Sequence, residues 1–301
     1  MSTKIASDFS PEVMKLFDQY VHGDIDRRAF LNCATNYAVG GMTATMLLDA
    51  LNPKFAQAQQ VKSDDPRVKT KSVDYASPDG YGKTRGYLAA PTKASGKLPG
   101  ILVIHENRGL NPHIEDITRR LALDNFIAFA PDALFPLGGY PGDEDKAREL
   151  FAKLEQSKSH NDFVNAAGVL KALPECTGKI GAVGFCYGGG IANLLATRIP
   201  DLGAAVPFYG PSPPAADVAK IKAPLLVQYA ENDERINAGW PAYEAALKAA
   251  GVKFEMFTYP GTQHGFNNDS FNNDTTPRYD EKAANLAWQR TIEYFNKNLR
   301  S

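Results

Sequence analysis

The fold is decided by one short stretch of the chain, Gly184-Phe185-Cys186-Tyr187-Gly188-Gly189-Gly190. It follows an apolar run at 180–183 and precedes a helix-like run at 191–196. This order predicts a strand, a tight turn and a helix, with a thiol nucleophile between the glycines. So sharp a turn requires glycine because larger side chains would collide with the backbone. The turn alone is equally consistent with a small buried cysteine beside an ordinary connection.

Strands and helices alternate along the chain beyond residue 67. Expected strands span 68–76, 84–90, 100–105, 126–130, 179–185, 204–209, 224–229 and 253–259. Expected helices span 114–123, 143–156, 162–173, 187–197, 238–250 and 279–299. The nearly all-apolar run at 100–105 indicates a strand buried on both faces, which is typical of a parallel sheet. The alternation predicts a doubly wound, mostly parallel α/β fold with helices on both faces.

A catalytic thiol requires a nearby base, and the base requires a group that orients it. In open α/β sheets such groups lie at the carboxyl ends of the strands. After the strand at 224–229, the polar loop offers three carboxylates, Glu231, Asp233 and Glu234. Each of them is otherwise an ordinary solvated loop residue, so this argument leaves the choice among them open.

The base is expected in the loop after the last strand, where His264 stands before Gly265 and Phe266. His264 combines the required chain order with a position directly after a strand. The alternative for a lone loop histidine is an exposed residue without a role. The other four histidines of the chain are His22, His105, His113 and His160.

The loop after the strand at 100–105 carries a third group of polar residues. We expect the backbone N–H groups of Asn107 and Tyr187 to form an oxyanion hole, each contributing about 3 kcal/mol to transition-state stabilisation. Glu106 in the same loop is expected near the Cys186 thiol, where like-charge repulsion raises a thiol pKa. It would keep the thiol protonated, and resistant to oxidation, until substrate displaces it.

Together these residues resemble the dienelactone hydrolase family, which are cysteine-dependent α/β-hydrolases. The resemblance covers residues 67–301 and rests on the stretch at 184–189, Glu106, Asp233 and His264-Gly265-Phe266. It selects Asp233 among the three carboxylates. It implies that Cys186 attacks an ester or lactone carbonyl, His264 acts as base and Asp233 orients His264. It further implies carboxymethylenebutenolidase-like hydrolysis through an acyl-thioenzyme, with a role for Glu106 in thiol activation and with no cofactor or metal.

The chain departs from the family at one substrate-binding position. Dienelactone-cleaving members carry an arginine four residues after the histidine, where this chain has Asn268. Arg108, Arg235 and Arg278 are candidates to replace it. The sequence therefore predicts a small ester or lactone substrate without identifying it.

The first 58 residues differ in character from the rest. Residues 10–31 predict an amphipathic helix, and Asp26-Arg27-Arg28-Ala29-Phe30-Leu31-Asn32 resembles a twin-arginine export motif. A mildly apolar stretch at 34–51 and the small residues Ala56-Gln57-Ala58 follow in the order of a cleavable signal.

These features predict a signal segment at 1–58, a domain at 67–301 and a periplasmic protein that begins near Gln59 after cleavage. The alternative is a helical extension packed on the domain of a cytoplasmic protein.

Composition narrows the classes of partner. The 33 basic and 34 acidic residues leave a net charge of −1, so nucleic acid is not an expected partner. Three cysteines do not suggest a disulfide framework, no cysteine–histidine group has zinc-site spacing, and no apolar run suits integral membrane association.

We expect a monomer or small homo-oligomer. Two alternatives stay open: a non-catalytic protein that binds a small ligand, and a peroxide-reactive thiol at Cys186, for which Cys176 is poorly placed as a resolving partner.

Overall fold

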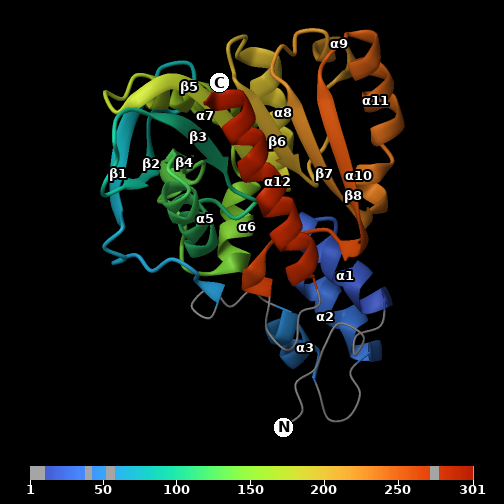
Figure 1. Ribbon diagram of the computed structural model, residues 1–301. Helices are drawn as coiled ribbons and strands as arrows, with labels where there is room; N and C mark the ends of the chain where they lie inside the picture. Colours follow the sequence, from blue (N-terminus) through green and yellow to red (C-terminus); the bar gives the residue numbers. More distant parts are fainter. Residues whose placement is uncertain (1–10, 38–42, 52–57, 272–277, 301) are drawn as a thin grey trace.

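A computed structural model of the 301-residue chain describes residues 11–37, 43–51, 58–271 and 278–300. Its centre is an eight-stranded sheet in the order β1-β2-β4-β3-β5-β6-β7-β8 (Figure 1). The strands are β1 (Val68–Ser77), β2 (Gly82–Pro91), β3 (Leu98–Ile104), β4 (Ile127–Pro131), β5 (Cys176–Phe185), β6 (Ala204–Phe208), β7 (Leu225–Asn232) and β8 (Phe254–Gln263). β2 pairs antiparallel with β1 and β4, and every other pairing is parallel. The predicted mostly parallel sheet is confirmed.

Helices cover both faces of this sheet. α5 and α12 pack on one face, whereas α7, α8 and α11 pack on the other. The helices of the domain are α5 (Pro112–Leu123), α6 (Glu144–Phe151), α7 (Gln156–Lys171), α8 (Tyr187–Arg198), α9 (Ala215–Val218), α10 (Glu234–Asn237), α11 (Trp240–Ala249) and α12 (Glu281–Leu299). Helix α6 is shorter than the helix expected at 143–156, and α7 begins earlier than expected, at Gln156.

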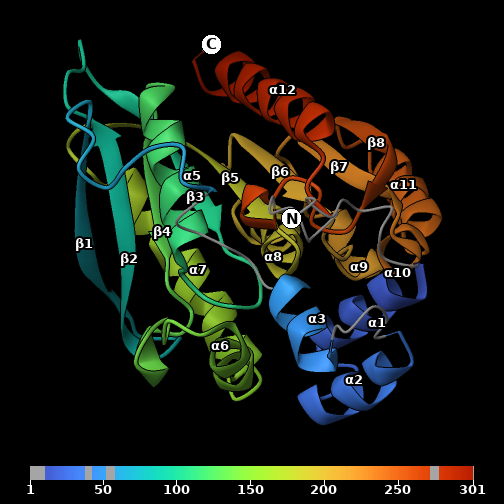
Figure 2. The same ribbon diagram turned by 90° about the horizontal axis from the view of Figure 1, so that it is seen from below.

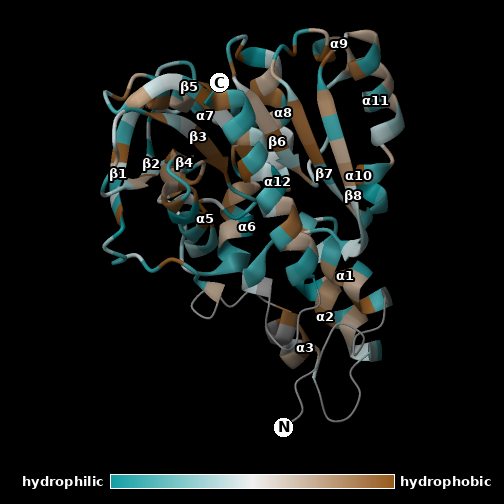
Figure 3. Cartoon of the chain, viewed as in Figure 1, coloured by the Kyte–Doolittle hydropathy of each residue, from teal (hydrophilic) through white to brown (hydrophobic). Residues whose placement is uncertain are grey.

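The core lies between the sheet and these helices, and Figure 3 shows hydrophobic residues concentrated along the central strands. In β3 the four residues Ile101–Ile104 are fully buried, as the all-apolar run indicated. Burial of each such side chain is worth roughly 1.5–3 kcal/mol relative to exposure. The parallel strands are therefore held rigidly, and so are the loops that leave their carboxyl ends.

The described part of the N-terminal segment contains three α-helices, α1 (Pro11–His22), α2 (Arg27–Ala34) and α3 (Ala44–Leu51). The prediction of a single helix over 10–31 is wrong. The helix is interrupted because Gly23 takes a positive φ of 85° and Asp26 caps a new helix. The three helices share a small core of their own that contains Phe17, Tyr20 and Phe30. Figures 1 and 2 show them gathered at one end of the sheet, close to α10.

Polar contacts attach this segment to the domain. The Tyr20 hydroxyl donates to Asp145 on α6, and the Tyr20 ring lies 4.2 Å from the Arg148 guanidinium carbon. Arg278 pairs with Asp18 at 3.1 Å. The described part of residues 1–58 therefore packs on the domain in this structure. Residues 38–42 of the apolar stretch and Ala56-Gln57 of the cleavage motif lie outside the described residues.

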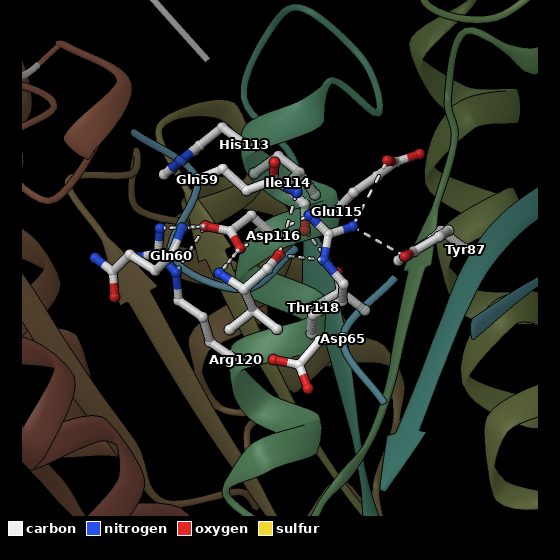
Figure 4. A network of polar contacts seen from close by, with 12 residues as sticks. Gln59, Gln60, Asp65, Tyr87, His113, Ile114, Glu115, Asp116, Thr118 and Arg120 are labelled. Carbon is white, nitrogen blue, oxygen red and sulfur yellow. Dashed lines mark hydrogen bonds and ion pairs between the residues drawn. The ribbon is translucent and has the colours of Figure 1, made fainter. Parts of the chain in front are cut away.

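Directly after this segment, Gln60 and Val61 are hydrogen-bonded to α5. Figure 4 shows Asp116 at the centre of the contacts: its carboxylate accepts hydrogen bonds from the backbone N–H groups of Gln60, at 3.0 Å, and Val61, at 2.8 Å. Arg119 donates to the Val61 carbonyl at 2.8 Å. These hydrogen bonds hold Gln60 and Val61 against α5. Within the described ranges, no helix has both the length and the apolar character needed to cross a bilayer.

Candidate active site

The sharp turn between β5 and α8 has the geometry that its glycines imply. Cys186 takes φ 56° and ψ −116°, which is strained for a residue with a side chain. A Cβ at Gly184 would lie 1.9 Å from the Gly188 carbonyl oxygen, and one at Gly188 would lie 2.3 Å from the Ile104 carbonyl oxygen. The packing excludes larger residues at both positions. It places Cys186 between β5 and the N-terminus of α8.

The structure brings Asp233 and His264 together from two neighbouring strands. Asp233 follows β7 and His264 follows β8, and the Asp233 carboxylate lies 2.6 Å from His264 Nδ1. The Asp233 carboxylate also accepts from the Ile236 backbone N–H at 3.3 Å, which fixes its direction. Glu231 and Glu234 are exposed, and Glu231 accepts instead from the Gly261 N–H at 2.8 Å. Asp233 is therefore the carboxylate positioned to orient His264.

The Cys186 thiol faces two histidines rather than one. The sulfur, the His264 imidazole and the His22 imidazole place their nitrogen and sulfur atoms within 4.8 Å of one another. Cys186 Sγ lies 3.6 Å from His22 Nε2, which lies 3.3 Å from His264 Nε2. All three residues are largely buried, and Cys186 is only 8% exposed.

His22 is the residue that the sequence did not assign to the site. It ends α1, and its Nδ1 lies 2.8 Å from the Asp18 carbonyl oxygen and 3.4 Å from the Asp18 carboxylate. His22 stands 164 residues before Cys186 and belongs to no motif. The apolar face of α1 was the one available signal, since it indicated packing against something without showing what.

These contacts decide the charge state of the thiol. Burial raises the pKa of Cys186, but the nearby His264 cation and hydrogen bonds from both histidines hold that pKa well below its ordinary value. Burial lowers the pKa of His264, but the Cys186 thiolate and Asp233 outweigh it and raise this pKa to about 10. The site therefore favours a thiolate–imidazolium pair at neutral pH. This differs from the protonated thiol expected from Glu106, because two imidazoles face the sulfur.

Glu106 lies close enough to interact electrostatically with the thiol. Burial, together with the Cys186 charge, raises the pKa of Glu106. Its carboxylate accepts a hydrogen bond from the Asn268 side chain at 3.1 Å. Asn268, which stands where dienelactone-cleaving members carry arginine, is thus engaged with Glu106.

A cavity of about 310 Å³ opens beside the thiol. Asn107 and Tyr187 line it, as an oxyanion hole requires, but their backbone donors stay a prediction. The Asn107 side chain is held at 3.0 Å to the Val21 carbonyl on α1. Tyr209 also lines the cavity, and its buried hydroxyl has no hydrogen-bond partner among the described residues.

The three candidate arginines occupy different places. Arg108 is buried and lies 3.6 Å from Glu144, and Arg278 pairs with Asp18. Arg235 is exposed, lines the cavity beside Cys186, and forms no ion pair with any described residue. Arg235 is therefore the candidate best placed to meet an anionic group on a substrate.

His105 and Cys176, which the sequence analysis also considered, lie in different parts of the domain. His105 is fully buried, its pKa is lowered by burial to about 4, and its Nε2 accepts from the Ala133 N–H at 3.1 Å. It therefore joins the loops after β3 and β4 as a neutral ring. Cys176 begins β5 and Cys186 follows its end, so the thiols lie roughly 30 Å apart at about 3.3 Å per residue. Cys176 is too distant to act as a resolving partner.

Comparisons with known proteins give two family matches and several similar proteins. The model of the "Dienelactone hydrolase family" matches residues 84–299, and a model described as "YqhI-like" matches residues 1–39, which include His22. A "Putative carboxymethylenebutenolidase" of Salmonella typhi is 34% identical over 224 residues, covering 69% of this chain and 81% of that protein. A "Putative hydrolase fragment YghX" of Escherichia coli is 54% identical over 109 residues, covering 36% of this chain and 93% of that protein.

The fold also has solved counterparts. The crystal structure of a "Putative Dienelactone Hydrolase" from Klebsiella pneumoniae superposes with a TM-score of 0.66 at 29% identity. The match covers 76% of this chain and 99% of that protein.

Proposed function

The chain belongs to the dienelactone hydrolase family, and we propose that it hydrolyses carboxylic ester or lactone bonds through Cys186, His264 and Asp233. One observation carries the proposal: His264 holds Asp233 at 2.6 Å through Nδ1 and lies with its other nitrogen beside the Cys186 sulfur. This is the arrangement of a nucleophile, its base and the group that orients the base.

The reaction follows from these positions. The Cys186 thiolate attacks the substrate carbonyl carbon, and the carbonyl oxygen becomes an oxyanion that the backbone amides of Asn107 and Tyr187 stabilise. When the tetrahedral intermediate collapses, the carbon–oxygen bond breaks and the His264 imidazolium protonates the departing alkoxide. His264 then accepts a proton from water, and the hydroxide attacks the acyl-thioenzyme. The products are a carboxylic acid and the regenerated thiolate, and Asp233 keeps the His264 ring in one orientation throughout.

Acid quenching during turnover tests the acyl-thioenzyme directly. The enzyme turns over excess p-nitrophenyl acetate and is then quenched with acid. We expect mass spectrometry to find one acetyl group on the peptide that contains Cys186. Cys33, which is exposed, and Cys176, which is buried, serve as internal controls for non-specific acylation. Steady turnover of p-nitrophenyl acetate with acetyl only on Cys33 would contradict the proposal.

Arg235 is expected to select substrates that carry a carboxylate. Arg235→Gln should raise KM for cis-dienelactone about tenfold, since loss of one charged hydrogen bond costs about 1.5 kcal/mol. KM for uncharged p-nitrophenyl acetate should stay within twofold. Arg67→Gln, which removes an exposed arginine paired with Asp65, is the matched control. An equal rise in KM for both substrates would contradict a carboxylate-binding role.

The twin-arginine-like motif stays a prediction of export. In the structure Arg27 pairs with Asp145 and Arg28 is exposed, while cleavage near Gln59 would remove His22 from the site. N-terminal sequencing of protein from the native periplasm tests this. A terminus near Gln59 would support export with cleavage, and an intact terminus at Met1 or Ser2 in that compartment would contradict it.

A further inference from the structure

We propose that His22, Cys186 and His264 bind one divalent transition-metal ion of the zinc class, and that the ion, when bound, blocks the thiolate. The site depends on His22, which the hydrolytic triad does not include, so the inference goes beyond the proposed function. The ligand would be a soft or borderline cation, because one thiolate and two imidazoles favour zinc, cobalt, nickel or copper over magnesium and calcium.

The spacing of the three ligand atoms suits a tetrahedral ion. With metal–nitrogen distances of about 2.0–2.1 Å and a metal–sulfur distance of about 2.3 Å, a tetrahedron has edges of about 3.3 Å between nitrogens and about 3.6 Å between nitrogen and sulfur. His22 Nε2 lies 3.3 Å from His264 Nε2 and 3.6 Å from Cys186 Sγ. The remaining edge, between Cys186 Sγ and His264, is no longer than 4.8 Å.

Both histidines are held in the orientation that metal binding requires. His264 Nδ1 lies 2.6 Å from Asp233, and His22 Nδ1 lies 2.8 Å from the Asp18 carbonyl oxygen. Partners of this kind on the far nitrogen orient metal-bound histidines, and losing one typically costs 10–100-fold in affinity. With hydrogen on each Nδ1 of the neutral imidazoles, both Nε2 atoms are free to bind an ion beside the sulfur.

The fourth position of the tetrahedron has space and a polar neighbour. His22 and Cys186 both line the cavity of about 310 Å³, so water can reach an ion held between them. Tyr209 lines the same cavity, and its ring centroid lies 4.9 Å from that of His264.

Occupancy has a chemical consequence for the thiol. The ion takes the sulfur lone pair that would attack a carbonyl and the Nε2 atom with which His264 accepts protons. Any protons on these atoms pass to solvent as the ion binds. The bound form is therefore inactive in thiol-dependent hydrolysis, and removal of the ion restores the nucleophile. A chain that begins near Gln59 keeps Cys186 and His264 but lacks the third ligand.

Cobalt titration of the full-length, chelator-treated protein tests the site. We expect one Co²⁺ per chain, with intense visible bands of tetrahedral cobalt and a near-ultraviolet thiolate charge-transfer band. Zn²⁺ should displace the cobalt and abolish both bands. His22→Gln should weaken Co²⁺ binding more than about tenfold, the least that is lost when only the hydrogen-bond partner of a metal-bound histidine is removed. His160→Gln removes a histidine on α7 and Cys33→Ala removes the exposed thiol, so both variants should bind as the wild type does.

A second readout does not depend on enzyme activity. Zn²⁺ should protect Cys186 from iodoacetamide in the wild type but not in His22→Gln, and circular dichroism should show that the variant is folded. A cobalt spectrum without the thiolate band, the same band in Cys186→Ser, or unchanged affinity in His22→Gln would each overturn the proposal. Absence of ester and lactone hydrolysis in the metal-free protein, with the cobalt bands intact, would reject the proposed function and leave the metal site standing.

Discussion

Cys186→Ala is expected to lower kcat for p-nitrophenyl acetate by about 10⁴-fold or more, because removal of a catalytic nucleophile costs a comparable factor in other triad enzymes. Alanine cannot form the proposed acyl-thioenzyme, whereas the cavity and the proposed backbone donors of Asn107 and Tyr187 stay in place. The remaining rate should come only from binding of the substrate and polarisation of its carbonyl group. Steady-state assays with a chelator present, so that no metal competes for the thiol, measure this effect.

Cys176→Ala is the matched control for this variant. Cys176 is a buried, free cysteine on the same strand, β5, but it lies at the opposite end from the turn. Its substitution removes the same side chain and should leave kcat within about twofold, apart from a modest loss of stability from the small cavity. Cys186→Ala with more than a tenth of the wild-type kcat would contradict nucleophilic catalysis by this residue.

His264→Gln should lower kcat by about 10²–10⁴-fold and should also shift the pH at which the thiol ionises. Burial raises the pKa of Cys186, and the His264 cation is the leading influence that lowers it. Removing that cation therefore moves the Cys186 pKa upward. In the wild type, iodoacetamide should alkylate Cys186 rapidly at pH values well below about 8.5, the ordinary thiol pKa, and more slowly only as acid protonates the thiolate. In His264→Gln the decline should begin at higher pH.

The control for the pH measurement is His160→Gln. It removes a partly buried histidine on α7 that is not part of the group formed by His22, Cys186 and His264. Its alkylation profile should coincide with that of the wild type. Peptide mapping assigns the modified cysteine, since Cys33 is exposed and reacts as an ordinary thiol. Coincident profiles for the wild type and His264→Gln would show that His264 does not stabilise the thiolate.

The alternation of strands and helices along the chain and the turn at Cys186 could be predicted because both depend on residues close together in the sequence. An all-apolar run such as Ile101–Ile104 can be satisfied only by burial on both faces, and the structure buries it completely. Gly184 and Gly188 are required by backbone contacts within the turn itself. The N-terminal helix was predicted less well, since the break at Gly23 depends on a single positive φ.

The loops that carry Asp233 and His264 were only partly predictable from the sequence. Chain order placed Asp233 and His264 after adjacent strands, and the pairing of β7 with β8 brings them to 2.6 Å. Chain order could not distinguish Asp233 from its neighbours Glu231 and Glu234, because burial against His264 makes the difference. Chain order also does not predict the charge state of the Cys186 thiol, because that state depends on every ionisable group that packs around the sulfur.

The parallel sheet, the strained turn that carries Cys186, and the chain order of Cys186, Asp233 and His264 can be read from the sequence, since they follow from local sterics and from alternating burial. The position of His22 within 3.6 Å of the thiol is visible only in the folded chain. This contact joins residues 164 positions apart through packing between separate elements. No local pattern encodes it, so the second histidine at the thiol became visible only in three dimensions.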